Sequence, residues 1–76
     1  MLIHIRLLGS FAKFGSKLND GMLNLEMGAC IKDVIDELRM PSQNIMLVLI
    51  NGHHASLNAE LSEGDIVQIF PPVGGG

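Results

Sequence analysis

Aromatic and basic residues are scarce in this chain of 76 residues, and cysteine occurs only once. The chain has three Phe and neither Trp nor Tyr, so its core must be packed by aliphatic side chains and Met. Five scattered Lys and Arg residues stand against eight Asp and Glu, which gives a formal net charge of −3. Because a nucleic-acid site needs clustered cations to neutralise phosphates, the composition argues against nucleic acid as a partner.

Long apolar runs and paired cysteines are also lacking. The longest apolar run, Ile45–Ile50, falls far short of the roughly 20 residues that cross a bilayer. The start of the chain, Met1–Arg6, has neither the charged region nor the cleavage site of a signal peptide. Cys30, the single cysteine, has no partner for an internal disulfide. Together these absences predict a cytoplasmic protein that does not contact a membrane.

Hydrophobic residues make up 47% of the chain, which is enough for the core of one small domain. In the first part of the chain, apolar residues alternate over 3–7, and a second such segment covers 22–27. This two-residue period predicts two strands, whose separation suits an antiparallel hairpin. Phe11 and Phe14, in the connection, are expected to pack into one end of the core.

A helical period replaces the strand period in the middle of the chain. Its apolar face, spaced i, i+3, i+4 and i+7, consists of Ile31, Val34, Ile35 and Leu38. Cys30 stands where a Ser or Thr cap would be expected. Pro41 is predicted to end the helix, because the residue before a proline avoids the helical region. The carboxylates of this segment are interpreted as a solvated outer face and not as a catalytic cluster: Asp33, Asp36 and Glu37.

The second half of the chain predicts three more strands. The apolar run 46–50 indicates a central strand buried on both faces. Asn51-Gly52 follows at once and is the strongest short-range hairpin signal, since both residues tolerate the positive φ of a type I′ turn. A short returning strand over 53–55 comes next, and a last strand is predicted over 66–70.

The last predicted strand has two apolar faces. Val67 and Ile69 lie on one side, while Ile66 and Phe70 lie on the other together with Gln68. If the helix covers the Val67 side, Ile66 and Phe70 would lie exposed beside the root of the C-terminal tail. Because an exposed apolar patch often marks a partner surface, this face is predicted to dock on other proteins. The alternative is burial of the two side chains by a neighbouring loop.

The predicted order of elements is strand, strand, helix, strand, short strand, strand. The simplest layered solution is an α+β domain with one mixed sheet and one main helix packed across one face. That is the β-grasp arrangement of ubiquitin. The domain is expected to cover residues 1–72, with residues 73–76 forming a flexible glycine-rich tail.

The tail is the most informative part of the sequence. It reads Phe70-Pro71-Pro72-Val73-Gly74-Gly75-Gly76. The prolines fix φ and stiffen the exit from the sheet, and the glycines lack side chains, so they can enter a narrow channel in another protein. A terminal carboxylate is a poor electrophile that must first be activated, for example as a mixed anhydride with AMP. A sulfur donor can then displace AMP and leave a thiocarboxylate on Gly76.

Two segments resemble a known family. They are the turn and strand Leu61-x-x-Gly64-Asp65-x-Val67, and the ending Phe70-Pro71-Pro72-Val73 with its final Gly75-Gly76. Together with the length and the Asn51-Gly52 hairpin, they resemble the MoaD/ThiS family of ubiquitin-like sulfur carriers. The double proline is more similar to the small subunit of molybdopterin synthase than to thiamine-type carriers, which usually lack it.

The resemblance implies a carrier whose partners perform the catalysis. An E1-like adenylating enzyme would use ATP to activate Gly76, and a sulfur-transfer system would form the thiocarboxylate. A large subunit of the molybdopterin synthase type would then accept the tail during synthesis of the molybdenum or tungsten cofactor. The chain itself would bind no cofactor or metal. The residues implied in partner binding are Ile66, Phe70, Pro71, Pro72, Val73, Gly74 and Gly75.

Alternative functions remain open at this point. The same adenylation chemistry serves a thiamine-type carrier and a ubiquitin-like modifier conjugated to lysines. A third alternative is an interaction module with an inert tail. His53-His54 is not interpreted as a metal site, because neighbouring strand residues point to opposite faces. Cys30 is interpreted as a packed or capping residue and not as the sulfur nucleophile, because no base or clear thiolate-stabilising charge accompanies it.

Overall fold

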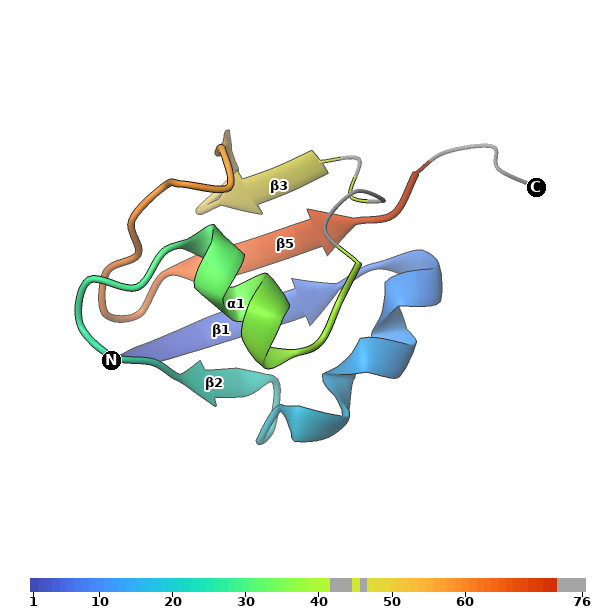
Figure 1. Ribbon diagram of the computed structural model, residues 1–76, viewed down its shortest axis with the longest axis horizontal. Helices are drawn as coiled ribbons and strands as arrows, with labels where there is room; N and C mark the ends of the chain where they lie inside the picture. The colour runs from blue at the N-terminus through green and yellow to red at the C-terminus, as the bar shows by residue number, and fades with distance from the viewer. Residues whose placement is uncertain (42–44, 46, 73–76) are drawn as a thin grey trace.

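The computed structural model describes residues 1–41, 45 and 47–72. Strands form one layer and a short helix lies across it (Figure 1). The elements in chain order are β1 (Leu2–Leu7), η1 (a 3₁₀-helix, Gly9–Lys17), β2 (Met22–Asn24), α1 (Ile31–Glu37), β3 (Leu47–Ile50), β4 (His53–His54) and β5 (Ile66–Phe70).

The five strands form one mixed sheet in the order β2-β1-β5-β3-β4. β1 and β5 pair in parallel at its centre, with Ile5 opposite Val67, and the other neighbours pair antiparallel. The predicted hairpin of the first two strands is confirmed, with Ile3 opposite Leu23. This is the predicted α+β, β-grasp fold, in which the last strand lies in the middle of the sheet.

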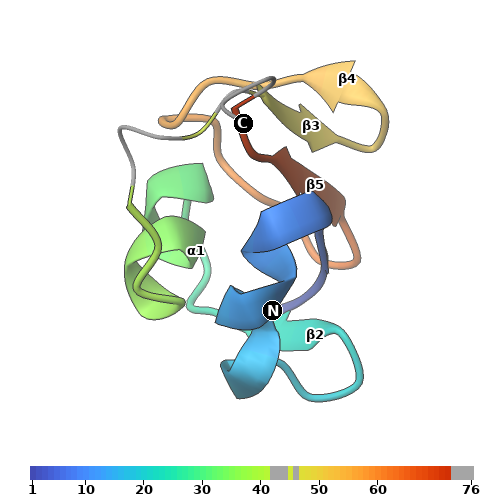
Figure 2. The ribbon, with the colours of Figure 1, turned by 90° about the vertical axis from the view of Figure 1, so that its right-hand side faces the viewer.

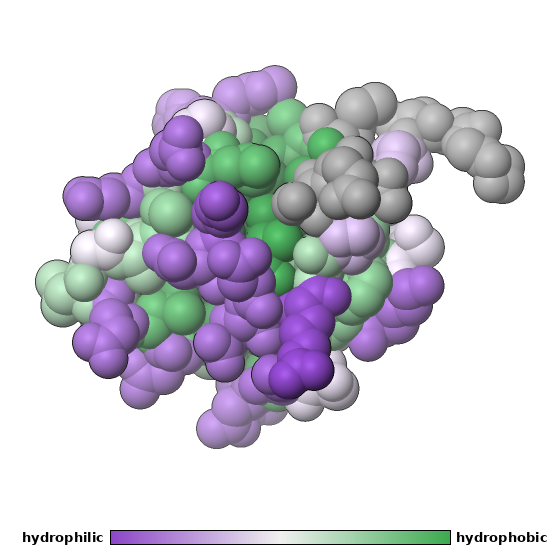
Figure 3. All heavy atoms as spheres, in the orientation of Figure 1, coloured by the Kyte–Doolittle hydropathy of each residue, from purple (hydrophilic) through white to green (hydrophobic). Residues whose placement is uncertain are grey.

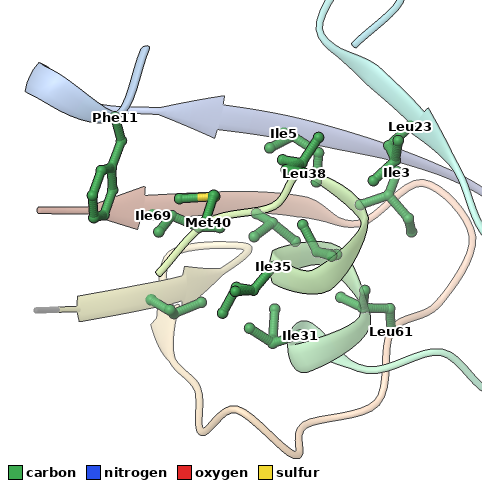
Figure 4. Close-up of a cluster of buried hydrophobic side chains, with 13 residues drawn as sticks. Ile3, Ile5, Phe11, Leu23, Ile31, Ile35, Leu38, Met40, Leu61 and Ile69 are labelled. Atoms are coloured by element: carbon green, nitrogen blue, oxygen red, sulfur yellow. The ribbon is translucent and has the colours of Figure 1, made fainter. Parts of the chain in front are cut away.

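The core lies between α1 and one face of the sheet, as the end-on view shows (Figure 2). Ile31, Val34 and Ile35 of α1 are fully buried, which confirms the predicted apolar face of the helix. They pack against strand residues of the central pair, and the labelled side chains converge in the same space (Figure 4). Burying one such aliphatic side chain contributes about 1.5–3 kcal/mol.

The helix ends differently from the prediction. α1 stops at Glu37, and Arg39 has a φ of +58°, in the left-handed region. The Met40 amide donates to the Ile35 carbonyl at 3.0 Å and the Arg39 amide to the Asp36 carbonyl at 3.1 Å. These two bonds form a Schellman motif, which satisfies the last carbonyls of the helix. The turn at Arg39 therefore ends α1 before Pro41 can do so.

The segment η1 has no counterpart among the predicted elements. It covers one end of the sheet beside α1 (Figure 2). Phe11 is buried, and its ring meets that of the half-buried Phe14 edge to face at a centroid distance of 5.8 Å. The expected packing of both Phe residues at one end of the core is confirmed. Gly15 and the surrounding polar residues gave no helical period to detect.

The strand predicted over 46–50 is present as β3 (Leu47–Ile50), but the prediction that both of its faces are buried is wrong. In β3 only Val48 is buried, whereas Leu47 and Leu49 are half-buried, because α1 covers only one face of the sheet. The Asn51-Gly52 hairpin is confirmed, with φ values of +52° and +84°.

None of the helices among the described residues is long and apolar enough to cross a membrane.

Candidate partner-docking site

The root of the C-terminal tail lies at the end of the central strand β5. Phe70 pairs with Leu47 of β3, and its ring is half-buried. On the other side of β5, the Leu8 amide donates to the Ile69 carbonyl at 3.1 Å. Pro71 and Pro72 come next and have no amide hydrogen to continue the ladder. The central position of β5 therefore brings the tail out between two strands and not at an edge of the sheet.

Pro71 packs against the first residue of η1, Gly9. Gly9 has a φ of +55°, and a β-carbon built there would lie 3.3 Å from Pro71 Cγ. Such a separation is tighter than most contacts of real β-carbons. The Pro71 ring therefore packs closely against the backbone of Gly9 at the point where the chain leaves the sheet.

The predicted reactive end lies outside the described residues. Val73, Gly74, Gly75 and Gly76 belong to residues 73–76, so their proposed roles stay predictions. Of the predicted tail contacts, the structure describes Pro71, which is half-buried, and Pro72, which is exposed.

The face of the sheet opposite α1 is called here the open face. Side chains alternate along each strand, and Val67 and Ile69 are buried beneath α1, so their neighbours along β5 point to the open face. The strand register assigns to this face Leu2, His4, Arg6, Met22, Asn24, Leu47, Leu49, His54, Ile66, Gln68 and Phe70. The predicted division of the two faces of β5 is therefore confirmed.

Ile66 and Phe70 share the open face but not the same end of it. Ile66 begins β5 opposite His4, whereas Phe70 ends the strand. Four residues of strand separate their Cα atoms by about 13 Å. The expectation that both lie beside the tail root is thus wrong for Ile66, which is 37% exposed near the Asn51 turn. The four-residue spacing along a single strand already places Ile66 at the end of the face opposite the tail.

A polar network holds the beginning of β5 in place. The Asn51 side chain donates to Asp65 Oδ1 at 2.9 Å and accepts a hydrogen bond from the Ile66 amide at 2.9 Å. Asp65 Oδ2 in turn accepts from the Ser62 amide at 2.8 Å. Gly64, with a φ of +84°, donates its amide to the Leu2 carbonyl at 2.9 Å. The Gly64-Asp65 turn therefore has a structural role in positioning β5.

Cys30 is the N-cap residue of α1, as the capping interpretation proposed. Its amide donates to Asp33 Oδ2 at 2.8 Å. This hydrogen bond is the largest cause that lowers the pKa of Asp33 below its usual value, with smaller contributions from the Cys30 side chain and from Lys32. The contact stabilises the first turn of the helix.

The other polar candidates occupy solvated positions. Hydrophilic side chains gather over α1 (Figure 3), where Asp33, Asp36 and Glu37 are all exposed, as predicted. His53 and His54 are exposed as well, and they pair with successive residues of β3, which places them on opposite faces. Within the described part of the chain, no group of three or more His, Cys, Asp or Glu side chains could hold a metal ion.

Several solved structures share this fold. The small archaeal modifier protein 1 of Haloferax volcanii is 25% identical over 95% of this chain and 98% of its own, with a TM-score of 0.74. A putative molybdopterin converting factor, subunit 1, from Pyrococcus furiosus is 22% identical over 96% of this chain and 99% of its own, with a TM-score of 0.73.

A further match comes from a protein complex. It is the complex of subunits 1 and 2 of molybdopterin-converting factor from Helicobacter pylori, with 20% identity over the full length of both chains and a TM-score of 0.58. No curated protein matches significantly.

The family model gives the most direct assignment. The model described as ThiS family matches residues 8–76, which is most of the chain and includes η1, the Gly64-Asp65 turn and the tail. The predicted likeness to the MoaD/ThiS carriers is confirmed at this level. This chain, a β-grasp domain with a central last strand and a glycine-rich ending, therefore belongs to the ThiS family of ubiquitin-like sulfur carriers.

Proposed function

We propose that this protein carries sulfur as a thiocarboxylate on Gly76 and donates it in molybdopterin biosynthesis. The main support is the match of the ThiS family model to residues 8–76, which includes the whole tail. The Phe70-Pro71-Pro72-Val73 ending favours the molybdopterin pathway over the thiamine pathway. The likeness in fold to a molybdopterin converting factor subunit 1 agrees with this choice.

The proposed chemistry modifies the terminal carboxylate in two steps. First, the Gly76 carboxylate attacks the α-phosphorus of ATP, which forms an acyl adenylate and releases pyrophosphate. A nucleophile at the oxidation level of sulfide then attacks the acyl carbon, so that a carbon–sulfur bond forms and AMP leaves. Glycine suits this step because a β-carbon would crowd the attack. The chain contributes the carboxylate, and partner enzymes contribute ATP binding and catalysis, so no bound cofactor is required.

The proposed partners are an E1-like adenylating enzyme, a sulfur-transfer system and a large synthase-type subunit. The Helicobacter pylori relative is solved as a complex of subunits 1 and 2, which supports a large-subunit partner for this chain. The open face is the proposed docking surface, because the half-buried apolar side chains of Phe70 and Leu47 lie on it beside the tail root. If Phe70 anchors this surface, Phe70→Ala should weaken binding by about tenfold.

The decisive experiment is the intact mass of the protein isolated from its native cells without harsh reductant or alkylation. A subpopulation heavier by one replacement of oxygen by sulfur, confined to the terminal peptide, would support the carrier. Deletion of Gly76 should abolish loading and leave stability unchanged, because the tail follows the last strand of the core. Sulfur loading that persists after this deletion would refute the mechanism.

A second candidate is a protein modifier joined to lysines. The relevant observation is the fold and 25% identity shared with the small archaeal modifier protein 1 of Haloferax volcanii. The same adenylation of Gly76 would precede transfer to a lysine ε-amine. Gly76 remnants on lysines of larger proteins, found by mass spectrometry of digests, together with unmodified mass of the free protein, would favour this candidate.

A further inference from the structure

The open face has a charge pattern different from that of the whole chain. The chain carries a formal net charge of −3, yet β1 to β5 contain no Asp or Glu. Arg6 is the one Lys or Arg residue in these strands, and it is exposed on the open face. Glu63 lies at the beginning of β1, away from Arg6, where its carboxylate accepts a hydrogen bond from the Leu2 amide at 3.0 Å.

The strand residues in the same row as Arg6 include no Asp or Glu. The neighbour of Arg6 across the parallel pair is Gln68, a neutral amide. Gln68 is followed in the same row by Leu49 and then by His54. The row nearer the tail holds the apolar pair Phe70 and Leu47. The Arg6 guanidinium group thus lies at the edge of an apolar surface, and the neutral side chain of Gln68 separates it from Leu49.

We propose that the activating enzyme presents a carboxylate to Arg6 when it docks on the open face. The inference rests on the proposed function and specifies the chemistry of its partner: an apolar surface that contains an acidic group. Arginine favours this pairing because its planar fork binds both oxygens of a carboxylate. The attraction also steers the encounter, since the rest of the chain repels an acidic surface.

A second copy of this chain is a poorer occupant of the open face. In a two-fold symmetric dimer the same surface meets itself, so each Arg6 would face a surface without a carboxylate. Because like charges brought together at an interface are unfavourable, the face is not complementary to itself in charge.

The test is the substitution Gln68→Glu, which adds a negative charge beside Arg6 without a change in shape. The matched control is Asn58→Asp, the same kind of change at an exposed position. Asn58 lies on the helix side, because its neighbours Leu57 and Ala59 accept hydrogen bonds from amides at the start of α1. Pyrophosphate exchange by the E1-like adenylating enzyme of the source organism gives KM and kcat for each variant.

The expected result is a KM about tenfold higher for Gln68→Glu, which equals about 1.4 kcal/mol of binding energy, with kcat unchanged. Arg6→Ala should raise KM similarly, and Asn58→Asp should stay within about twofold of the natural chain. Increasing the ionic strength should raise KM for the natural chain more steeply than for Arg6→Ala, because salt screens the proposed attraction.

Three outcomes would overturn the proposal, and they are distinguishable. If Gln68→Glu and Asn58→Asp both match the natural chain, docking occurs without a carboxylate at Arg6. If sedimentation shows a dimer that Gln68→Glu stabilises, the face binds a second copy. If the natural chain itself supports no pyrophosphate exchange, the proposed function fails together with the inference that rests on it.

Discussion

The two faces of β5 differ sharply although they belong to one strand. Val67 and Ile69 are 0% exposed beneath α1, whereas Ile66 is 37% exposed on the open face. The covered face holds the fold together, and the open face is available for partners. A domain this small buries a limited fraction of its surface. Its single α-helix covers one side of the sheet and leaves the other side open. Core packing and the proposed partner binding thus involve alternate residues of the same strand.

The largest expected effect separates these two faces. Ile69→Ala should destabilise the protein by about 2–5 kcal/mol, because it leaves a cavity among the fully buried side chains. Ile66→Ala should cost less than about 1 kcal/mol, because water already reaches that side chain. Urea unfolding followed by circular dichroism measures both values. Equal losses would show that the open face is packed as tightly as the covered one.

The next effect concerns the contact between Gly9 and Pro71 at the tail root. Gly9→Ala places a β-carbon 3.3 Å from Pro71 Cγ, so the proline must shift by a few tenths of an ångström. Gly28→Ala is the control, since Gly28 also has a positive φ but no atom within 4 Å of the built β-carbon. Both variants should lose about 1–2 kcal/mol to backbone strain.

Sulfur loading distinguishes these two glycine variants. Only Gly9→Ala should also slow the loading of Gly76, because only that substitution displaces Pro71, and small misplacements of reacting groups reduce rates. Loading rates measured at saturating partner, with urea unfolding in parallel, test this difference. Equal rates in the two variants would mean that the contact between Gly9 and Pro71 does not guide the tail.

A smaller, stabilising effect is expected at the end of the covering helix. Arg39 adopts a φ of +58°, where a side chain is unfavourable and glycine is not. Arg39→Gly should therefore raise the free energy of unfolding by about 1 kcal/mol. Thermal unfolding measures this gain. A decrease in stability would indicate that the Arg39 side chain makes contacts that outweigh the backbone strain.

The smallest expected effect is a pH dependence at the start of the same helix. The Cys30 amide and the other Asp33 contacts lower the pKa of Asp33 from 3.8, so its contribution to stability is fully present above that value. The contribution is lost as the pH falls through the lowered pKa of the folded state. Asp33→Asn should thus be less stable than the natural chain near neutral pH, with the difference shrinking below about pH 3.8.

Unfolding curves measured from neutral to acidic pH test the role of Asp33. A difference between the two proteins that stays constant across this range would contradict a role for the ionised carboxylate.

Local patterns in the sequence were sufficient to predict most of the helices and strands. The alternation in β1 and β5 and the helical spacing of Ile31, Val34 and Ile35 predicted which side chains are buried. The Asn51-Gly52 pair predicted its hairpin, because the required backbone angles belong to those two residues. The 3₁₀-helix η1 was not predicted, since its few apolar residues show no helical period.

Residues close together in the chain are enough to specify the two-faced strands, the amphipathic helix and the ending proposed for activation at Gly76. Only packing of the whole chain, by contrast, pairs β1 and β5 in parallel at the centre of the sheet. The contact between Gly9 and Pro71 likewise depends on the tertiary structure. These contacts join distant parts of the chain, so no local pattern encodes them, and they form only when the whole core packs.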